Sequence, residues 1–260
     1  MRDWIELGDL KTCAIVANTM RFRQNLEPLL MDAPKADRIT VIAPHPDDEM
    51  LGPGGVLLHA IKSATPVHVI YLTSGKFPEE IENETKSIGN KVGYTCQFLR
   101  LPLGAIPNDE KTVSLLAKAL ESSNPRALFL PFLFDDHDEH RRANELLLKA
   151  HDRGLLSKKI EIWGYQVYTA LPGNVVIDIT DVSSAKADVI RGWESQMRTR
   201  DWAHYMLGLN AFNCRFLKSR KVAYAECFFV LPLQDYIDLC RIYFVDPSKT
   251  YYSAGYTSAN

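Results

Sequence analysis

Short hydrophobic runs alternate with amphipathic segments from about residue 38 to residue 168. The runs are unbroken and rich in Val, Ile, Leu and Phe, which is typical of strands buried on both faces of a sheet. Between them, apolar residues recur at helical spacing. The pattern predicts strands at 39–43, 67–72, 96–100, 127–132 and 161–168, and helices near 54–63, 79–92, 111–121 and 139–152.

This alternation predicts an α/β fold with a mostly parallel sheet, helices on both faces and right-handed crossovers. We interpret residues 1–260 as a single domain, with a core at about 38–168 and a C-terminal β/α elaboration at about 169–245. An outer helix is expected over residues 20–30. In the elaboration we expect a strand at 175–179, a helix at 183–198, a strand at 222–231 and a helix at 233–243.

Composition narrows the class of protein. Hydrophobic residues make up 46% of the 260 residues, enough for a sizeable core, and the net charge of −2 gives no support for a nucleic-acid partner. The five cysteines are widely spaced and form no Cys-x-x-Cys pair, as expected for reduced thiols in the cytoplasm. The longest apolar stretch, 127–134, is far shorter than the ~20 residues that span a bilayer. We therefore expect a cytoplasmic protein without stable membrane insertion, with a homo-oligomer left open.

Candidate chemistry follows the first predicted strand. The strand at 39–43 leads directly into His45-Pro46-Asp47-Asp48-Glu49, and glycines and a helical pattern come next. Ligands bind at this edge of an α/β sheet, where strands end and helices begin. Imidazole nitrogen and carboxylate oxygen suit Zn²⁺ and also Fe²⁺. The plain alternative is that Asp47 and Asp48 cap the following helix.

A second turn of the same kind follows the strand at 127–132. There the chain reads Asp135-Asp136-His137-Asp138-Glu139-His140 before a helical segment. The plain alternative is a solvated loop. Two turns at the ends of two strands can converge on one point, and two histidines with a carboxylate around an open position are typical of a catalytic metal site.

These parts predict a hydrolase acting on an amide. The metal lowers the pKa of a bound water and polarises the substrate carbonyl, a carboxylate outside the ligand set moves the water proton, and a nearby histidine stabilises the oxyanion. The sequence contains neither a Gly-x-Ser-x-Gly elbow nor a Gly-x₄-Gly-Lys phosphate loop.

The two turns resemble the signatures of the PIG-L/LmbE-like metal-dependent N-deacetylases. Ala43 to Glu49 resembles the first signature, and Asp135-x-His137-x-Glu139-His140 resembles the second. Looser similarities extend the resemblance to roughly residues 38–231. It implies a Rossmann-like fold, a zinc cofactor (with Fe²⁺ also suited) and removal of the acetyl group from an N-acetylglucosamine-type sugar in glycan or glycoconjugate biosynthesis.

The resemblance also implies roles for single residues. His45, Asp48 and His140 match the metal ligands. Asp47 matches the general base, His137 the histidine that stabilises the tetrahedral intermediate, and Glu139 an acid expected to orient that histidine.

Two positions depart from the family pattern, which leaves the substrate open. Ile81 stands where several members have an arginine, and Gly104 lies in a segment where several have a sugar-contacting aspartate. Two alternatives therefore remain: an amidase for a larger acyl group or conjugate, and a catalytically silent sugar-binding module.

Overall fold

The computed structural model describes residues 27–157, 159–169, 171, 173–218 and 221–244. Their strands form one mixed sheet of eight in the order β1-β7-β8-β6-β5-β2-β3-β4. Within it β8 is antiparallel to its two neighbours, and the other pairings are parallel. The strands are β1 (Leu29–Met31), β2 (Ile39–Ala43), β3 (Val67–Tyr71), β4 (Thr95–Phe98), β5 (Ala127–Pro131), β6 (Glu161–Tyr165), β7 (Val175–Asp178) and β8 (Ala225–Pro232).

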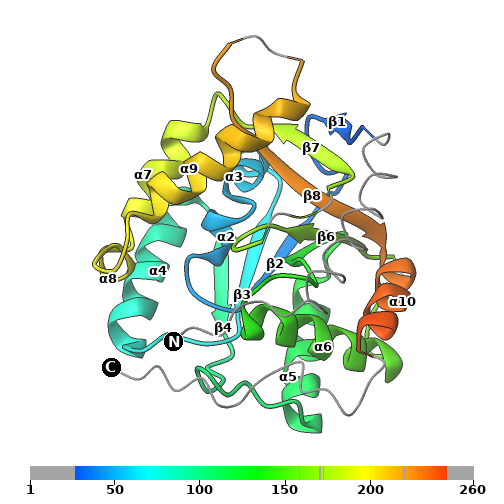
Figure 1. Ribbon diagram of the computed structural model, residues 1–260. Coiled ribbons are helices and arrows are strands. Elements are labelled where there is room, and N and C mark those ends of the chain that lie inside the picture. The colour runs from blue at the N-terminus through cyan, green and yellow to red at the C-terminus, as the bar shows by residue number, and fades with distance from the viewer. Residues whose placement is uncertain (1–26, 158, 170, 172, 219–220, 245–260) are drawn as a thin grey trace, which may run out of the picture.

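Helices cover both faces of the sheet, so the fold is the Rossmann-like α/β fold predicted from the sequence (Figure 1). The helices are α2 (Asp48–Leu51), α3 (Gly54–Lys62), α4 (Pro78–Val92), α5 (Glu110–Ser123), α6 (Asp138–Asp152), α7 (Ser183–Arg191), α8 (Glu194–Met197), α9 (Trp202–Asn213) and α10 (Leu233–Tyr243), with a 3₁₀ turn, η1 (Cys214–Phe216). Each strand and helix predicted between residues 39 and 168 is confirmed, with ends that differ from the prediction by at most three residues.

The sheet separates two apolar cores, because successive side chains of a strand point to opposite faces. In β2, Val41 and Ala43 join the core under α3, α7 and α9, whereas Ile42 joins the core under α5, α6 and α10. In β5, Phe129 joins the first of these cores and Leu128 joins the second. Central strands buried on both faces account for the unbroken hydrophobic runs in the sequence.

The structure differs from the prediction in two C-terminal places and one N-terminal place. The segment 183–198 is two helices, α7 and α8, because the chain turns at Gly192 and Trp193. Helix α9 was not expected from the sequence pattern. The expected helix over residues 20–30 is wrong at its end, where Leu29–Met31 pairs with β7 as strand β1; residues 20–26 lie outside the described residues.

The cysteines of the described residues, Cys96, Cys214, Cys227 and Cys240, are free; Cys13 lies outside them. No helix in the described part of the chain is long and apolar enough to cross a membrane.

Candidate metal centre

The two predicted turns lie side by side at the carboxyl edge of the sheet. β2 and β5 are hydrogen-bonded neighbours that run parallel, with Val41 opposite Phe129. The segment after β2 therefore reaches the same place as the segment after β5. The first turn brings His45, Asp47 and Asp48 to this edge, and the start of α6 brings in the residues of the second turn.

Asp48 lies at the centre of the cluster. Its Oδ2 is 3.2 Å from His45 Nδ1 and 3.3 Å from His140 Nε2, and it also accepts the backbone N–H of His45 at 2.8 Å. Burial opposes ionisation of Asp48, but the two imidazoles outweigh it and hold the pKa of this carboxyl well below its usual range. The other oxygen, Oδ1, is buried and has no hydrogen-bond partner among the described residues.

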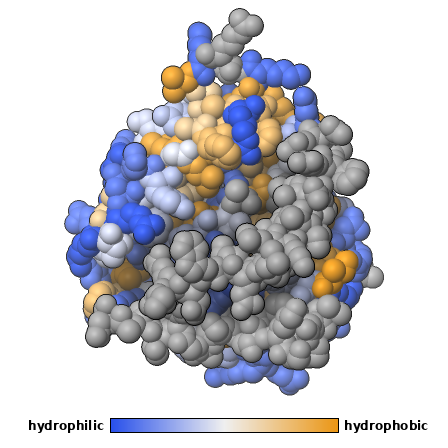
Figure 2. Space-filling model, in the orientation of Figure 1, coloured by the Kyte–Doolittle hydropathy of each residue, from blue (hydrophilic) through white to orange (hydrophobic). Residues whose placement is uncertain are grey.

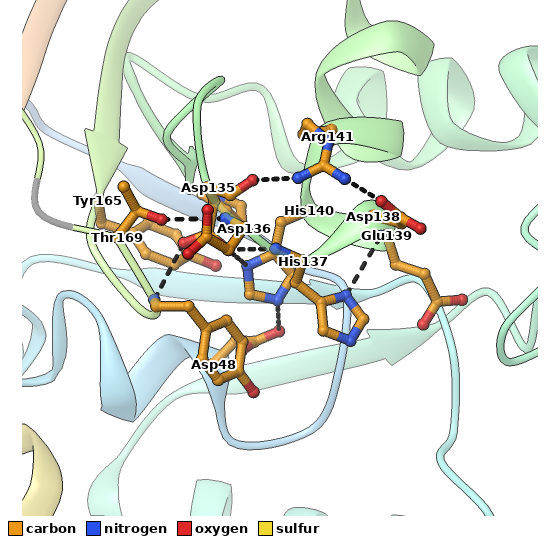
Figure 3. Close-up of polar contacts among 12 residues, drawn as sticks. Asp48, Asp135, Asp136, His137, Asp138, Glu139, His140, Arg141, Tyr165 and Thr169 are labelled. Atoms are coloured by element: carbon orange, nitrogen blue, oxygen red, sulfur yellow. Dashed lines mark hydrogen bonds and ion pairs between the residues drawn. The ribbon is translucent and has the colours of Figure 1, made fainter. Parts of the chain in front are cut away.

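His140 lies between two carboxylates (Figure 3). Its Nε2 faces Asp48, and its Nδ1 lies 3.1 Å from Asp135 Oδ1. Asp135 is itself fixed by the backbone N–H groups of His137 and Tyr168. Burial alone would lower the pKa of His140, but the two carboxylates raise it to about 9. A carboxylate behind a ligand histidine orients the ring and increases its basicity, a role that the sequence analysis did not assign to Asp135.

His45 is also held by two carboxylates. Its Nε2 lies 2.6 Å from Glu139 Oε2, while its Nδ1 faces Asp48. The other oxygen of Glu139 accepts the backbone N–H of Gly104 at 2.8 Å. Burial lowers the pKa of His45, but Asp48 and Glu139 outweigh it and raise the pKa to about 10. Glu139 was expected to orient His137; the structure places its carboxylate on His45.

His137 caps the start of α6. Its Nδ1 accepts the backbone N–H of Glu139 at 3.2 Å. Burial and the neighbouring imidazoles of His45 and His140 lower the pKa of His137 to about 4, which favours a neutral ring. A neutral ring whose Nδ1 accepts a hydrogen bond carries its proton on Nε2. His137 therefore has an N–H available for a ligand.

Asp47 has a strained backbone, with φ of 117°. It stands before α2, but its carboxylate makes no capping hydrogen bond, so the capping alternative does not describe it. The side chain is 7% exposed, and burial together with the charges of Asp48 and Glu49 raises its pKa. Strain of this kind persists where surrounding contacts enforce it and is found at functional sites.

Glu49 holds that strained backbone. Its Oε2 accepts the N–H of Asp47 at 3.2 Å, and its Oε1 accepts the hydroxyls of Tyr71 at 2.6 Å and Tyr94 at 2.8 Å. Burial raises the pKa of Glu49 to about 7 although both tyrosines oppose it. No role for Glu49 was predicted from the sequence. Its position in the first motif was the only indication of a role in the sequence. The tyrosines that bind it lie 22 and 45 residues away along the chain, so the sequence pattern does not connect them with it.

The cluster fits a divalent cation. Ligand atoms of His45, His137 and His140 all lie within 4.8 Å of one another, and Asp48 adds a carboxylate whose Oδ1 is without a partner among the described residues. Imidazole and carboxylate donors in this number match a zinc site. The predicted ligands His45, Asp48 and His140 are brought together, and His137 lies beside them.

The profile of the family described as PIG-L, GlcNAc-PI de-N-acetylase, matches residues 40–151, a segment that contains both turns. Over this segment the chain belongs to the PIG-L/LmbE-like family.

Solved structures share the fold. A conserved protein of Thermus thermophilus has 25% sequence identity and a TM-score of 0.66, over 75% of this chain and 94% of that one. The N,N'-diacetylchitobiose deacetylase of Pyrococcus horikoshii has 21% identity and a TM-score of 0.67, over 91% and 97%. The 4-carboxy-2-hydroxymuconate hydratase of Pseudomonas putida has 16% identity and a TM-score of 0.60, over 75% and 95%. The last two show the fold alone. In this PIG-L/LmbE-like chain the side chains of the site, and not the fold, determine the reaction.

Proposed function

We propose that the protein is a metal-dependent hydrolase that removes the acetyl group from an N-acetylated amino sugar during glycan or glycoconjugate biosynthesis. One observation carries the proposal. A ligand cluster around Asp48 stands beside a carboxylate without a capping bond, Asp47, and an imidazole with a free Nε2–H, His137. These are the parts that amide hydrolysis by water requires.

We assign His45, Asp48 and His140 as the residues that hold the metal, Zn²⁺ or Fe²⁺. His137 is left out of this set, because a ring with its proton on Nε2 cannot ligate through that atom. When bound, the metal would lower the pKa of a water and polarise the acetyl carbonyl.

Asp47 is proposed as the general base. It takes a proton from the attacking water and delivers it to the amine of the sugar as the C–N bond breaks. Burial and the neighbouring carboxylates raise its pKa, which makes it a stronger base than an exposed aspartate. The strained backbone of Asp47, held by Glu49, keeps the carboxylate out of the capping position.

His137 is proposed as the oxyanion donor. Its Nε2–H would donate to the carbonyl oxygen as negative charge develops there. The hydrogen bond from the Glu139 backbone to Nδ1 fixes the required tautomer. Glu139 acts through His45, whose ring it orients.

The substrate class rests on the family description and on the name of the Pyrococcus horikoshii deacetylase. A hydratase shares the fold, so the fold does not select the reaction. Gly104 has no side chain and donates its backbone N–H to Glu139, and the Ile81 side chain is buried at 3% exposure, so neither position offers a polar side chain to the sugar.

The test is acetate release by zinc-loaded protein from free, nucleotide-linked and aryl-linked N-acetylhexosamines. Asp47→Asn should lower the rate by about 10²- to 10⁴-fold, the size of a general-base contribution, with the metal retained. His151→Ala, at the far end of α6, is the matched control and should leave the rate unchanged. No acetate from any sugar, with metal bound, would overturn the proposal; release of a longer acyl group instead would identify the amidase alternative.

A further inference from the structure

The two ends of the second turn are joined by one buried side chain, that of Asn144 in α6. Its side-chain amide donates two hydrogen bonds, to the carbonyl oxygen of Pro131 at 3.0 Å and to that of His140 at 2.9 Å. Pro131 is the last residue of β5, and His140 is the last residue of the turn. A single amide group thus binds both ends of the segment that supplies half of the metal centre.

Tyr236 of helix α10 holds the amide of Asn144 in this orientation. Its hydroxyl donates to Asn144 Oδ1 at 2.7 Å, and both side chains are fully buried. Burial raises the pKa of Tyr236 well above its usual value, and the backbone of Leu133 opposes this shift. Because the hydroxyl occupies Oδ1, the nitrogen of the amide has to face the two carbonyl oxygens.

This polar pair lies in apolar surroundings. Tyr236 belongs to the core under α5, α6 and α10, together with Leu130, Leu147 and Ile237. Apolar side chains of similar shape could fill the same space without a desolvation penalty. A buried polar network in which the donors and acceptors are matched instead specifies a single arrangement of the elements that it joins. Here it specifies where α6 begins relative to the end of β5.

The metal centre depends on that relative position. His140 and Glu139 lie in the first turn of α6, and their partners Asp48 and His45 come from the other motif. The contacts between the motifs are short: Glu139 Oε2 lies 2.6 Å from His45 Nε2, and His140 Nε2 lies 3.3 Å from Asp48 Oδ2. A small movement of α6 along β5 would separate these atoms, and sites of this kind need supporting contacts that prevent it.

Helix α10 lies outside residues 40–151, the segment that the family profile covers. Figure 1 draws it in orange-red beside α6. In the same orientation, Figure 2 shows hydrophilic residues and a small hydrophobic patch at the margin where α10 lies. The helix is therefore a surface helix, and its buried face carries the Tyr236 hydroxyl to Asn144.

We propose that Asn144 and Tyr236 are positioning residues of the metal centre, and that helix α10 thereby sets the position of His140 relative to Asp48. Both residues act through the backbone of the second turn, at the carbonyl groups of Pro131 and His140. This inference rests on the proposed function, because it takes His140 and Asp48 as metal ligands.

Zinc affinity tests the positioning role without turnover. Chelated protein is titrated with zinc against a competing chelator. Tyr236→Phe should weaken zinc binding by about tenfold, the lower end of the effect of groups that orient metal ligands, and Asn144→Leu at least as much. Ile237→Val is the matched control on the buried face of the same helix. Deleting a methyl group costs about as much stability as losing a hydrogen bond, yet this variant should keep the zinc affinity of wild type.

The double variant separates positioning from stability. Asn144→Leu alone leaves the Tyr236 hydroxyl buried without its acceptor, and adding Tyr236→Phe removes that unsatisfied group. Denaturant unfolding of the chelated proteins should therefore show the double variant to be more stable than Asn144→Leu. Its zinc affinity should stay as low as that of Asn144→Leu, because neither carbonyl regains a donor. Zinc affinity that recovers together with stability would overturn the positioning role.

Tyr236→Phe changes one hydroxyl and keeps the ring, so it decides the matter even where Asn144→Leu does not fold. Zinc affinity of Tyr236→Phe equal to that of wild type would overturn the inference and leave the proposed function standing. A wild-type protein that binds no zinc would instead overturn the assignment of the ligands, and the inference with it.

Discussion

The Nζ of Lys186 lies 2.7 Å from Oε1 of Glu226, and both side chains are buried. The Glu226 carboxylate also accepts the backbone N–H groups of Gly55 and Val56 at the start of α3, at 2.7 and 3.0 Å. A carboxylate at a helix start satisfies N–H groups that have no partner within the helix. Burial lowers the pKa of Lys186, and Glu226 opposes that shift.

The ammonium group of Lys186 reaches back to the motif. It donates to the carbonyl oxygens of Leu51 and Gly52 at 3.0 and 3.1 Å, at the end of helix α2, which begins at Asp48. Strand β8 and helix α7 thus fix the turn that carries the metal ligands, although they lie more than 130 residues away in the sequence.

Removing one member of this pair should be costly, because the other charge stays buried. We expect Lys186→Met or Glu226→Gln alone to lower the free energy of unfolding by about 3–5 kcal/mol, and the double variant to lose less than the sum of the two. Denaturant unfolding measures each value. Arg191→Met breaks an exposed pair with Asp188 and should cost less than about 1 kcal/mol. Additive losses would contradict direct coupling.

Asp47 should be a site where stability and activity conflict. Glycine adopts positive φ without strain, and its substitution also removes a carboxylate buried beside Asp48 and Glu49. We expect Asp47→Gly to raise the stability of chelated protein by about 1 kcal/mol while abolishing acetate release. Asp47→Asn keeps a side chain at the strained position and should gain less. A destabilised Asp47→Gly protein would show that the backbone at this position is not under strain.

Gly52 should be intolerant of a side chain. A Cβ there would overlap the ring of Tyr165, whose hydroxyl donates to the Ile42 carbonyl at 3.0 Å. We expect Gly52→Ala to cost about 1–3 kcal/mol and to weaken zinc binding, because the end of α2 has to shift. Gly208→Ala is the control: nothing lies within 4 Å of its Cβ in exposed α9, and it should stabilise the protein by about 0.5–1 kcal/mol. Denaturant unfolding curves measure the change in stability of each variant, and zinc titration measures the change in zinc affinity.

Acid stability should depend on Glu82. Its carboxylate accepts two hydrogen bonds from Arg100, at 2.8 and 2.9 Å, and Arg100 is the main reason that its pKa is lowered from 4.5 to about 2. A carboxyl whose pKa is lower in the folded state stabilises fully above its unfolded pKa and loses that contribution as the pH falls towards the folded value. The stabilisation should therefore disappear between about pH 5 and pH 2.

The variant Glu82→Gln should consequently lose less stability than wild type when the pH falls from 5 to 3. Glu79→Gln, at an exposed position of the same helix, serves as the control and should follow wild type. Parallel pH profiles for Glu82→Gln and wild type would rule out a contribution from this carboxylate.

The core of the fold and the convergence of the two turns were predictable because both follow from local pattern. Unbroken apolar runs specify central parallel strands, and parallel strands end at one edge, so His45 and His140 had to approach each other. The contact between Glu139 and His45 was not predictable in this way. It depends on the distance between two loops and on Gly104, which occupies the other carboxylate oxygen.

The elements that could not be predicted from the sequence have one property in common. They are stabilised by tertiary contacts rather than by local sequence pattern. Apolar residues are spread around α9, so no single stripe marked it as an amphipathic helix. Strand β1 is three residues long with two exposed leucines, and pairing with β7 defines it. Trp193, fully buried, turns the chain between α7 and α8 and donates its indole N–H to Thr85, 108 residues away.

The most direct test of the metal centre is a zinc titration of chelated protein, with acetate release from N,N'-diacetylchitobiose as the readout. One centre assembled from His45, Asp48 and His140 predicts that the rate rises in proportion to added zinc and stops rising at one ion per chain. His140→Ala should show no such rise. Acetate release that is independent of zinc, or zinc bound at one ion per chain without any acetate, would contradict the account.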